Sequence, residues 1–274
     1  MRFEFLGTGT SAGVPAIGCD CPVCASTDPR DNRLRTSAAL RFTDKTGQER
    51  TILLDAGPDL RQQALRAKLD RVDAILFTHN HVDHTFGLDE VRRFNVTMNA
   101  PIDVYAEQHT LNHLQRVYKH IFERESNVQD SFVATLVARR LEPGVTLDLL
   151  GLRVTPFRVL HGRLPILAYR LEPAGPGLDD PAGVFPLAYC TDVSGFPPES
   201  WRHLEGVRTL VLDALRRRHH PTHLTLDQAV NIAGRVGAYR TWLVHMSHDL
   251  PHEATNAGLP EGISLAHDGL VLGA

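Results

Sequence analysis

The sequence predicts a fold of mixed α-helices and β-strands, and three observations support this prediction. Apolar runs such as Val72 to Phe77 stop at polar residues, as short buried strands do. Longer stretches such as Glu107 to Phe122 space their apolar residues with a helical period. Strands followed by helices occur in two rounds, which is consistent with a two-sheet sandwich flanked by helices. We expect one domain over residues 1–274, a length that buries a sizeable core without disulfides.

In the first half of the chain, strands and helices are expected to alternate. The loop Gly7 to Gly13 lacks the spacing and the lysine of a P-loop, and we interpret it as a tight turn. Strands are predicted at Arg2–Leu6, Ser37–Phe42, Thr51–Leu54, Val72–Phe77 and Ile102–Ala106, and helices from near Pro58, at Leu88–Phe94 and at Glu107–Phe122.

In the second half, two apparent hairpins precede single strands and one clear helix. We assign the stretch 123–140 to either a flap over a pocket or a dimer contact. Strands are predicted at Val145–Leu149, Leu152–Arg158, Leu167–Leu171, Val184–Cys190, Thr209–Leu212, Thr241–Val244 and Ile263–Leu272, and a helix at Thr225–Val236.

The composition indicates an ordinary soluble protein. Charged residues make up 22% of the chain and the net charge is −3, so nothing points to a nucleic acid or a membrane surface as a partner. The start, Met1 to Gly7, lacks a secretory apolar core, and no run approaches the roughly 20 apolar residues of a spanning helix. We therefore expect a cytoplasmic protein.

The densest group of metal-binding side chains follows the strand Val72–Phe77. Three imidazoles and one carboxylate, which suit zinc, manganese, iron or nickel, fall within the six positions 79–84. Asp83 and His84 are adjacent and cannot easily turn toward the same ion as His79 and His81. Two neighbouring ions explain this spacing better than one.

The stretch 79–84, which reads HNHVDH, resembles the H-x-H-x-D-H signature of the metallo-β-lactamase superfamily of binuclear hydrolases. The resemblance covers nearly the whole chain and implies an αββα sandwich. It also implies further ligands at strand ends, for which His161, Asp192 and His245 fit the expected places. By this resemblance, one ion is held by His79, His81 and His161, the other by Asp83, His84 and His245, and Asp192 bridges the two.

A second candidate metal site lies near the N-terminus. Cys19, Cys21 and Cys24 are closely spaced thiols that would need one more ligand to form a tetrahedral zinc site. A glycine loop followed by this C-x-C-x-x-C resembles the PhnP-type phosphoribosyl cyclic phosphodiesterases. That resemblance implies His248 as the fourth ligand and a structural zinc, whereas Cys190 is expected to be a buried core residue.

Several other residues have candidate roles. Asp55 either accepts a hydrogen bond from a metal-binding imidazole or caps the turn into the helix near Pro58. His223 matches the position of a proton-donating histidine in the cyclic phosphodiesterases. The run Arg216 to Arg218 is either a solvated loop or a partner for a substrate phosphate, and histidines of the 107–122 helix are expected at solvent or at the pocket rim.

The resemblance implies a metal-dependent phosphodiesterase for a small cyclic phosphodiester, such as 5-phosphoribosyl 1,2-cyclic phosphate, that acts through a metal-bridging hydroxide. It implies two divalent catalytic ions, manganese or zinc, and one structural zinc. A small molecule is the expected partner, and a homodimer stays open. The alternatives are a tRNA 3′-processing nuclease, a thioester or lactam hydrolase, and a PqqB-like non-hydrolytic protein, which the stretch 55–63 also resembles. The chain lacks the long basic arm expected of the nuclease. The cysteine loop argues against a thioester or lactam hydrolase, and the intact 79–84 motif argues against a PqqB-like protein.

Overall fold

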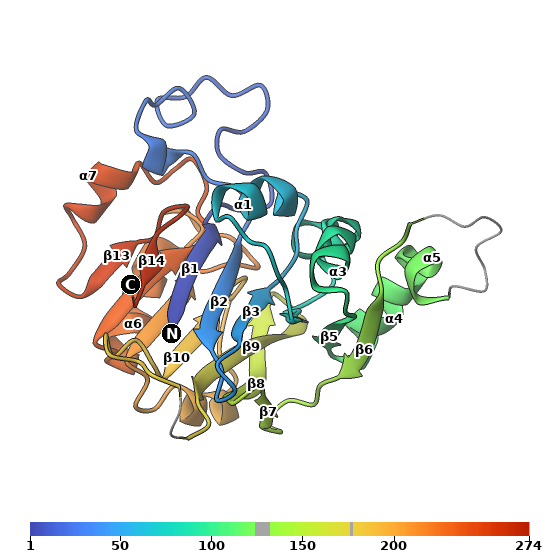
Figure 1. The fold of residues 1–274 in the computed structure, drawn as a ribbon. Coiled ribbons are helices and arrows are strands. Elements are labelled where there is room, and N and C mark those ends of the chain that lie inside the picture. Colours follow the sequence, from blue (N-terminus) through green and yellow to red (C-terminus); the bar gives the residue numbers. More distant parts are fainter. Residues whose placement is uncertain (124–131, 176–177, 274) are drawn as a thin grey trace.

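The computed structural model describes residues 1–123, 132–175 and 178–273. Within these ranges the chain forms two mixed β-sheets that pack face to face, with helices on the outer sides (Figure 1). The predicted α+β sandwich is therefore confirmed. The two sheets have related pairing patterns, because each combines a block of antiparallel strands with a block of parallel strands.

The first sheet has the strand order β14-β1-β2-β3-β4-β5-β6. Its pairs are antiparallel up to β3 and parallel from β3 onward. The strands are Val271–Leu272 (β14), Arg2–Gly7 (β1), Ser37–Thr43 (β2), Glu49–Leu54 (β3), Ala74–Leu76 (β4), Ile102–Ala106 (β5) and Leu136–Arg140 (β6).

The second sheet has the strand order β13-β12-β11-β10-β9-β8-β7. Strands β10 to β13 pair in parallel, so their carboxyl ends meet at one edge of the sheet. The strands are Leu147–Leu149 (β7), Leu152–His161 (β8), Leu164–Pro173 (β9), Leu187–Cys190 (β10), Thr209–Asp213 (β11), Arg240–Val244 (β12) and Ile263–Leu265 (β13).

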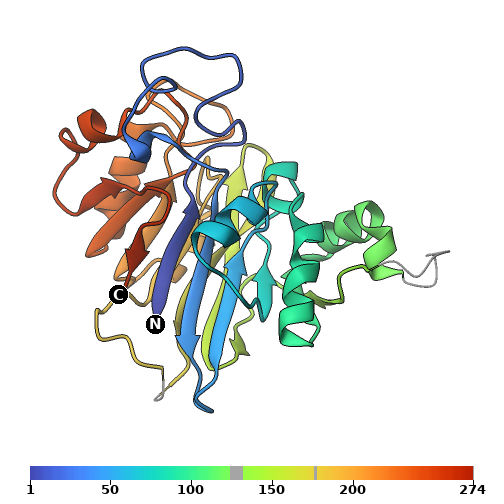
Figure 2. The ribbon, with the colours of Figure 1, turned by 45° about the horizontal axis from the view of Figure 1, so that its top comes forward.

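Helices cover both outer faces of the sandwich. In Figures 1 and 2, α1 and α3 lie in front of the first sheet, and the N-terminal loop, drawn in blue, lies beside the region of α7. The helices are Leu60–Arg66 (α1), Val82–Thr85 (α2), Arg92–Met98 (α3), Gln108–Val117 (α4), Lys119–Phe122 (α5), Leu226–Val236 (α6) and His252–Asn256 (α7), with 3₁₀ turns at Pro29–Asp31 (η1), Leu88–Val91 (η2) and Pro198–His203 (η4).

Strand β3 illustrates how the layers are held together. Its side chains alternate between the two faces of the sheet, so Ile52 and Leu54 join the core between the sheets while Leu53 joins the core under the helices. Both faces are buried, and the strand therefore reads as a continuous apolar run rather than an alternating one. A third apolar cluster, which includes Ala229 of α6, packs against the outer face of the second sheet.

Helix α6 has clear start and stop signals. Thr225 caps its N-terminus, where its hydroxyl accepts a hydrogen bond from the Gln228 backbone N–H and the Gln228 side chain reciprocates. Gly237, with a φ of 66°, ends the helix in the left-handed conformation that glycine adopts without strain. The helix connects the neighbouring parallel strands β11 and β12, and this crossover brings Asp213 opposite Val244, directly before His245.

Two predicted elements are divided in the structure. The predicted helix Glu107–Phe122 breaks at Tyr118, where φ is −104° and ψ is 41°, into α4 and α5. The Tyr118 hydroxyl donates to the Thr85 carbonyl, so its ring packs toward α2 rather than along one continuous helix. The predicted strand Ile263–Leu272 becomes β13 and β14, which belong to opposite sheets.

The helical stripes were also predicted too broadly. Leu65 of α1 and Val117 of α4 are apolar and would extend the buried stripe of each helix, but they are 63% and 38% exposed. Each helix contacts its sheet through a narrower face than the sequence suggested. In the unassigned stretch 123–140, Leu136–Arg140 forms edge strand β6, while residues 124–131 lie outside the described residues.

In the part of the chain that the structure describes, no helix combines the length and the apolar character needed to cross a lipid bilayer.

Candidate metal centre

The predicted metal ligands converge on one edge of the sandwich. The HNHVDH stretch follows β4, and its second half forms the short helix α2. The other ligands come from the ends of strands in the second sheet. His161 ends β8, Asp192 follows β10, and His245 follows β12.

One group consists of His79, His81 and His161. One nitrogen from each ring lies within 4.8 Å of the others, and the ring centroids are 4.5 to 5.5 Å apart. His79 and His161 are buried, whereas His81 is exposed at the pocket. Three converging imidazoles can bind a divalent transition metal.

A second group consists of Asp83, His84, Asp192 and His245, all of which are buried. The two carboxylate oxygens of Asp192 face different rings: Oδ2 lies 3.2 Å from Nε2 of His84, and Oδ1 lies 3.3 Å from Nε2 of His245. Asp192 also clusters with His161 of the first group. A carboxylate in this position can contribute oxygen atoms to two neighbouring ions.

The side chains fit divalent cations on chemical grounds. The Nε2 atom of His79 is buried without a hydrogen-bond partner, and the Nε2 atoms of His84 and His245 are buried against the Asp192 carboxylate. A buried polar atom without a partner is costly, by about 1–3 kcal/mol. Imidazole nitrogens and carboxylate oxygens that meet in this way are a donor set for zinc or manganese. The metal ions implied by the motif would therefore bind to these converging nitrogen and oxygen atoms.

A single buried carboxylate orients two of these rings. Asp55 accepts hydrogen bonds from Nδ1 of His84 at 2.8 Å and from the Thr78 hydroxyl at 2.9 Å. Because the Thr78 hydroxyl donates its proton to Asp55, its oxygen can accept the Nδ1 proton of His79, which lies 2.9 Å away. Both rings then point Nε2 toward the centre. A carboxylate that hydrogen-bonds to a metal-binding histidine commonly fixes the ring in this way. Asp55 does not cap α1, whose N-cap position is held by Asp59.

Burial and charge set the protonation of this centre. Burial lowers the pKa of His79, and nearby His84 lowers it further, which favours the neutral imidazole that binds metal. Burial acts in the opposite direction on Asp192, but His245 and His84 outweigh it and hold its pKa well below the usual range. Asp192 is therefore an ionised ligand.

Three functional residues have a left-handed backbone. The φ angles of Asp55, Asp192 and His245 are 61°, 57° and 60°, and each residue comes directly after a strand. A residue other than glycine loses about 1–2 kcal/mol in this conformation. Such strain clusters at functional sites, because a sharp turn at the strand end can aim a side chain where an extended chain cannot.

Close backbone packing also shapes the centre. A Cβ atom on Gly57 would lie 2.1 Å from the Asp83 carbonyl oxygen, and one on Gly87 would lie 2.0 Å from the Gly57 carbonyl oxygen. Only glycine allows the turn after Asp55 to approach α2 this closely.

The N-terminal cysteines form a separate cluster with His248. The Sγ atoms of Cys19, Cys21 and Cys24 lie 3.3, 3.7 and 3.3 Å from Nδ1 of His248. A single ring nitrogen carries at most one proton and cannot hydrogen-bond to three thiols. Zinc bond lengths in a tetrahedral site place sulfur and nitrogen about 3.5 Å apart, so the spacing fits zinc. Cys190 lies elsewhere, fully buried in the core as predicted.

His223 lies against the second group, and it also clusters with His161 and Asp192 and with Asp213 and His245. Its ring stacks on His245 with centroids 4.6 Å apart, and its Nδ1 lies 2.7 Å from Oδ2 of Asp213. Burial lowers the pKa of His223 to about 4, and burial raises the pKa of Asp213. The pair is thus a buried donor and acceptor that can share a proton. The role of Asp213 was not recognised from the sequence, although its position directly after the predicted strand Thr209–Leu212 was a usable signal.

A pocket of about 410 Å³ opens over the centre. Besides the metal-binding side chains and His223, its wall includes Ser11 of the glycine loop and His113 of α4. His113 lies at the pocket, one of the two environments expected for it.

The basic run Arg216 to Arg218 does not contribute to the described lining of this pocket. Arg216 donates hydrogen bonds to the carbonyls of Arg218 and His219, and Arg218 pairs with Asp249. These contacts favour the solvated-loop interpretation over a contact with substrate phosphate.

Sequence comparisons identify the family of this chain and similar proteins. Residues 50–246 match the model of the beta-lactamase superfamily domain. The chain is 36% identical over 274 residues to an octanoyltransferase of Porphyromonas gingivalis, covering 98% of this chain but 51% of that protein, so it spans about half of that protein's length. It is 30% identical over 237 residues to coenzyme PQQ synthesis protein B of Methylobacterium nodulans, covering 78% of this chain and 72% of that one.

Solved structures give a similar result. A diphosphatase described as new within the PhnP family superposes with a TM-score of 0.85 and 42% identity, covering 99% of this chain and 97% of that one. The short form of human tRNase Z superposes with a TM-score of 0.69 over 99% and 98% of the two chains, but at 20% identity it shares the fold alone.

Proposed function

Because this chain belongs to the beta-lactamase superfamily and, within it, to the PhnP-type metal-dependent hydrolases, we propose that it hydrolyses a small cyclic phosphodiester such as 5-phosphoribosyl 1,2-cyclic phosphate. One observation carries the proposal: His223 stacks on His245 and is hydrogen-bonded to the buried Asp213, and we assign this pair to proton transfer rather than to the ligand sets. A proton donor accelerates hydrolysis of a phosphodiester whose leaving group is an alkoxide, because an alkoxide leaves poorly unless it is protonated.

We assign each side chain a role in holding the cofactor. His79, His81 and His161 would bind one divalent ion, Asp83, His84 and His245 a second, and Asp192 both, with zinc or manganese as the metal. Two such ions, when bound, lower the pKa of water and stabilise charge on phosphoryl oxygens. Cys19, Cys21, Cys24 and His248 would hold a structural zinc that joins the N-terminal loop to the C-terminal part of the fold.

The protein's own residues then handle orientation and protons. Asp55 and Thr78 hold the rings of His79 and His84 with Nε2 facing inward. His223 would deliver a proton from Nε2 to the departing ester oxygen, while Asp213 accepts its Nδ1–H and stabilises the charged ring. The pocket volume suits a small ligand rather than a folded nucleic acid.

A second candidate is hydrolysis of a phosphoanhydride. The 42% identity to a PhnP-family diphosphatase over nearly the whole chain favours it. A phosphate leaving group is weakly basic and depends less on a proton donor than an alkoxide does, so the two candidates make different demands on His223.

The test is hydrolysis of 5-phosphoribosyl 1,2-cyclic phosphate by protein loaded with manganese or zinc. A diphosphate ester, 2′,3′-cyclic nucleotides and a precursor tRNA are assayed in parallel. We expect opening of the ribosyl cyclic phosphate, lost in Asp192→Ala. Activity on the diphosphate ester alone would favour the second candidate. Activity on the precursor tRNA alone, or on no phosphate ester while metal stays bound, would refute both in favour of a nuclease or a PqqB-like protein.

A further inference from the structure

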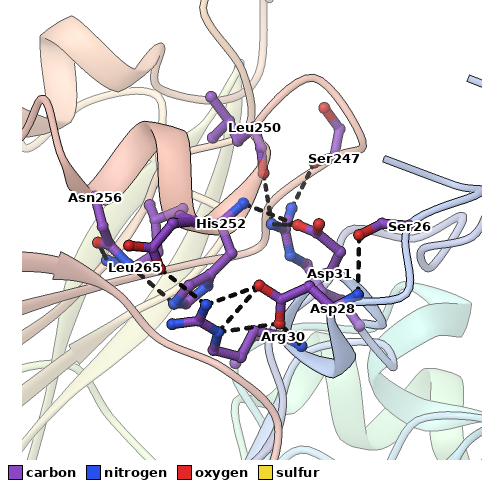
Figure 3. Close-up of polar contacts among 12 residues, drawn as sticks. Ser26, Asp28, Arg30, Asp31, Ser247, Leu250, His252, Asn256 and Leu265 are labelled. Carbon is purple, nitrogen blue, oxygen red and sulfur yellow. Dashed lines mark hydrogen bonds and ion pairs between the residues drawn. The ribbon is translucent and has the colours of Figure 1, made fainter. Parts of the chain in front are cut away.

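A buried arginine connects the N-terminal loop with the loop that follows β12. Arg33 is 1% exposed, and its guanidinium donates hydrogen bonds to the carbonyl oxygens of Ser247 at 2.7 Å and Leu250 at 2.5 Å. In Figure 3, Ser247 and Leu250 lie beside Asp31 of the N-terminal segment. One planar side chain thus fixes two peptide groups that are three residues apart.

Asp31 completes this contact. Its carboxylate pairs with the guanidinium of Arg33 at 3.3 Å and accepts the backbone N–H of His252 at 2.8 Å (Figure 3). The backbone of Arg33 is itself held, because it exchanges two hydrogen bonds with Val14 at 2.7 and 2.9 Å. The side chain therefore extends from a fixed base, and the segment from 247 to 252 is held at three points.

The held segment and the residues directly before it carry the proposed ligands of both metal sites. His245 of the catalytic group lies two residues before Ser247, and His248 of the cysteine cluster lies between the two carbonyls that Arg33 binds. On the other side, Met246 exchanges backbone hydrogen bonds with Thr8 and Thr10, both at 3.0 Å. Both histidines therefore lie in a stretch whose backbone is held at Met246 on one side and at Ser247 and Leu250 on the other.

Stability alone does not explain an arginine at this position. A buried ion pair is often no more stabilising than well-packed apolar residues, because both charges lose their hydration. The guanidinium instead fixes the orientation of the groups that it binds, because its rigid planar group can bind two carbonyls and a carboxylate at once.

We propose that Arg33 is a positioning residue for both metal sites, which fixes the 245–250 loop so that His245 and His248 point at their ions at the same time. The inference rests on the proposed assignment of these two histidines as ligands. It makes the two sites dependent on one side chain that contacts neither ion. Groups that orient ligands from outside typically change metal affinity by about 10- to 100-fold.

The test compares Arg33→Met with wild type in Co²⁺ titrations against a competing chelator, which need no substrate. Absorption from thiolate-to-cobalt charge transfer reports the Cys19, Cys21, Cys24 and His248 site, and the ligand-field bands report the catalytic ions. We expect Arg33→Met to weaken the cysteine site and one of the two catalytic ions by about tenfold or more. The ion of His79, His81 and His161 should keep its affinity, because Arg33 holds none of its ligands.

Arg30→Met is the matched control. Arg30 lies in the same segment, but it pairs with the side chains of Asp28 and Glu253 and binds neither loop carbonyl, so its replacement should leave all affinities unchanged. Adding methylguanidinium to Arg33→Ala should restore the two weakened affinities, which an effect of packing alone would not allow. If Arg33→Met does not fold, Arg33→Lys, which can reach one carbonyl, should show a smaller loss at the same two sites. Unchanged affinities, or equal loss at all three ions, would overturn the proposal.

Discussion

Replacing His223 with alanine should slow hydrolysis in proportion to the basicity of the leaving group. The ring of His223 is buried and its Nδ1 lies 2.7 Å from Oδ2 of Asp213, so the ring is already oriented for donation from Nε2 in the form that carries a proton on both nitrogens. A positioned general acid contributes about 100- to 10,000-fold, or about 3–5 kcal/mol of the activation barrier. For 5-phosphoribosyl 1,2-cyclic phosphate, whose leaving group is an alkoxide, kcat of His223→Ala should fall by this amount.

The same variant should retain most of its activity on bis(p-nitrophenyl) phosphate. The p-nitrophenolate group departs without a proton, so a loss of less than about tenfold is expected if proton donation is the only role of His223. The assay is kcat for both substrates with equal metal content confirmed in each preparation. His220→Ala is the control, since the His220 ring lies 5.1 Å from that of His223 and its Nδ1 contacts Thr222 instead of Asp213. Equal loss on both substrates would refute proton donation and would indicate that His223 supports the metal centre instead.

Four further predictions concern metal binding and stability. Asp55→Ala should weaken catalytic metal binding by about 10- to 100-fold in a chelator competition, because the His84 ring loses its acceptor. Cys24→Ser should lower the zinc content by one ion per chain in elemental analysis and lower the melting temperature, whereas loss of a catalytic ion instead would contradict the assignment. Burial lowers the pKa of His252 to about 4, so on acidification this histidine is protonated in the unfolded chain before it is protonated in the folded one. Stability should therefore fall as the pH drops from about 6.5 to 4, and His252→Phe should reduce this decline in thermal melts. Thr225→Ala should destabilise the protein by about 1 kcal/mol in urea unfolding, because α6 loses its N-cap.

The sequence predicted those parts of the centre that lie close together in the chain. The HNHVDH stretch needs only a strand before it and a turn within it to gather its side chains, so local pattern was sufficient. His161, Asp192 and His245 were proposed by order and resemblance, and the structure brings their side chains to the same edge. Strand positions were predicted well, because β3 and β11 are apolar runs bounded by turns.

Features that depend on distant contacts were not predicted. Asp213 becomes a partner of His223 only because β11 lies between β10 and β12, an order that the sequence does not state. The role of Arg33 depends on carbonyl groups more than 200 positions away, with separations of 214 and 217 residues. The break at Tyr118 likewise follows from a hydrogen bond to Thr85 on another helix, which helical periodicity cannot reveal.

The left-handed backbone conformation at Asp55, Asp192 and His245 affects which substitutions these positions should accept during evolution. Glycine would relieve the backbone at each position by about 1 kcal/mol or more, and asparagine would relieve part of it. Lineages or laboratory libraries selected for thermal robustness alone should therefore accumulate glycine or asparagine at these three positions. Selection for turnover should keep them as they are. Glycine or asparagine at these three positions would thus identify, from sequence alone, descendants that keep the fold but have lost the activity.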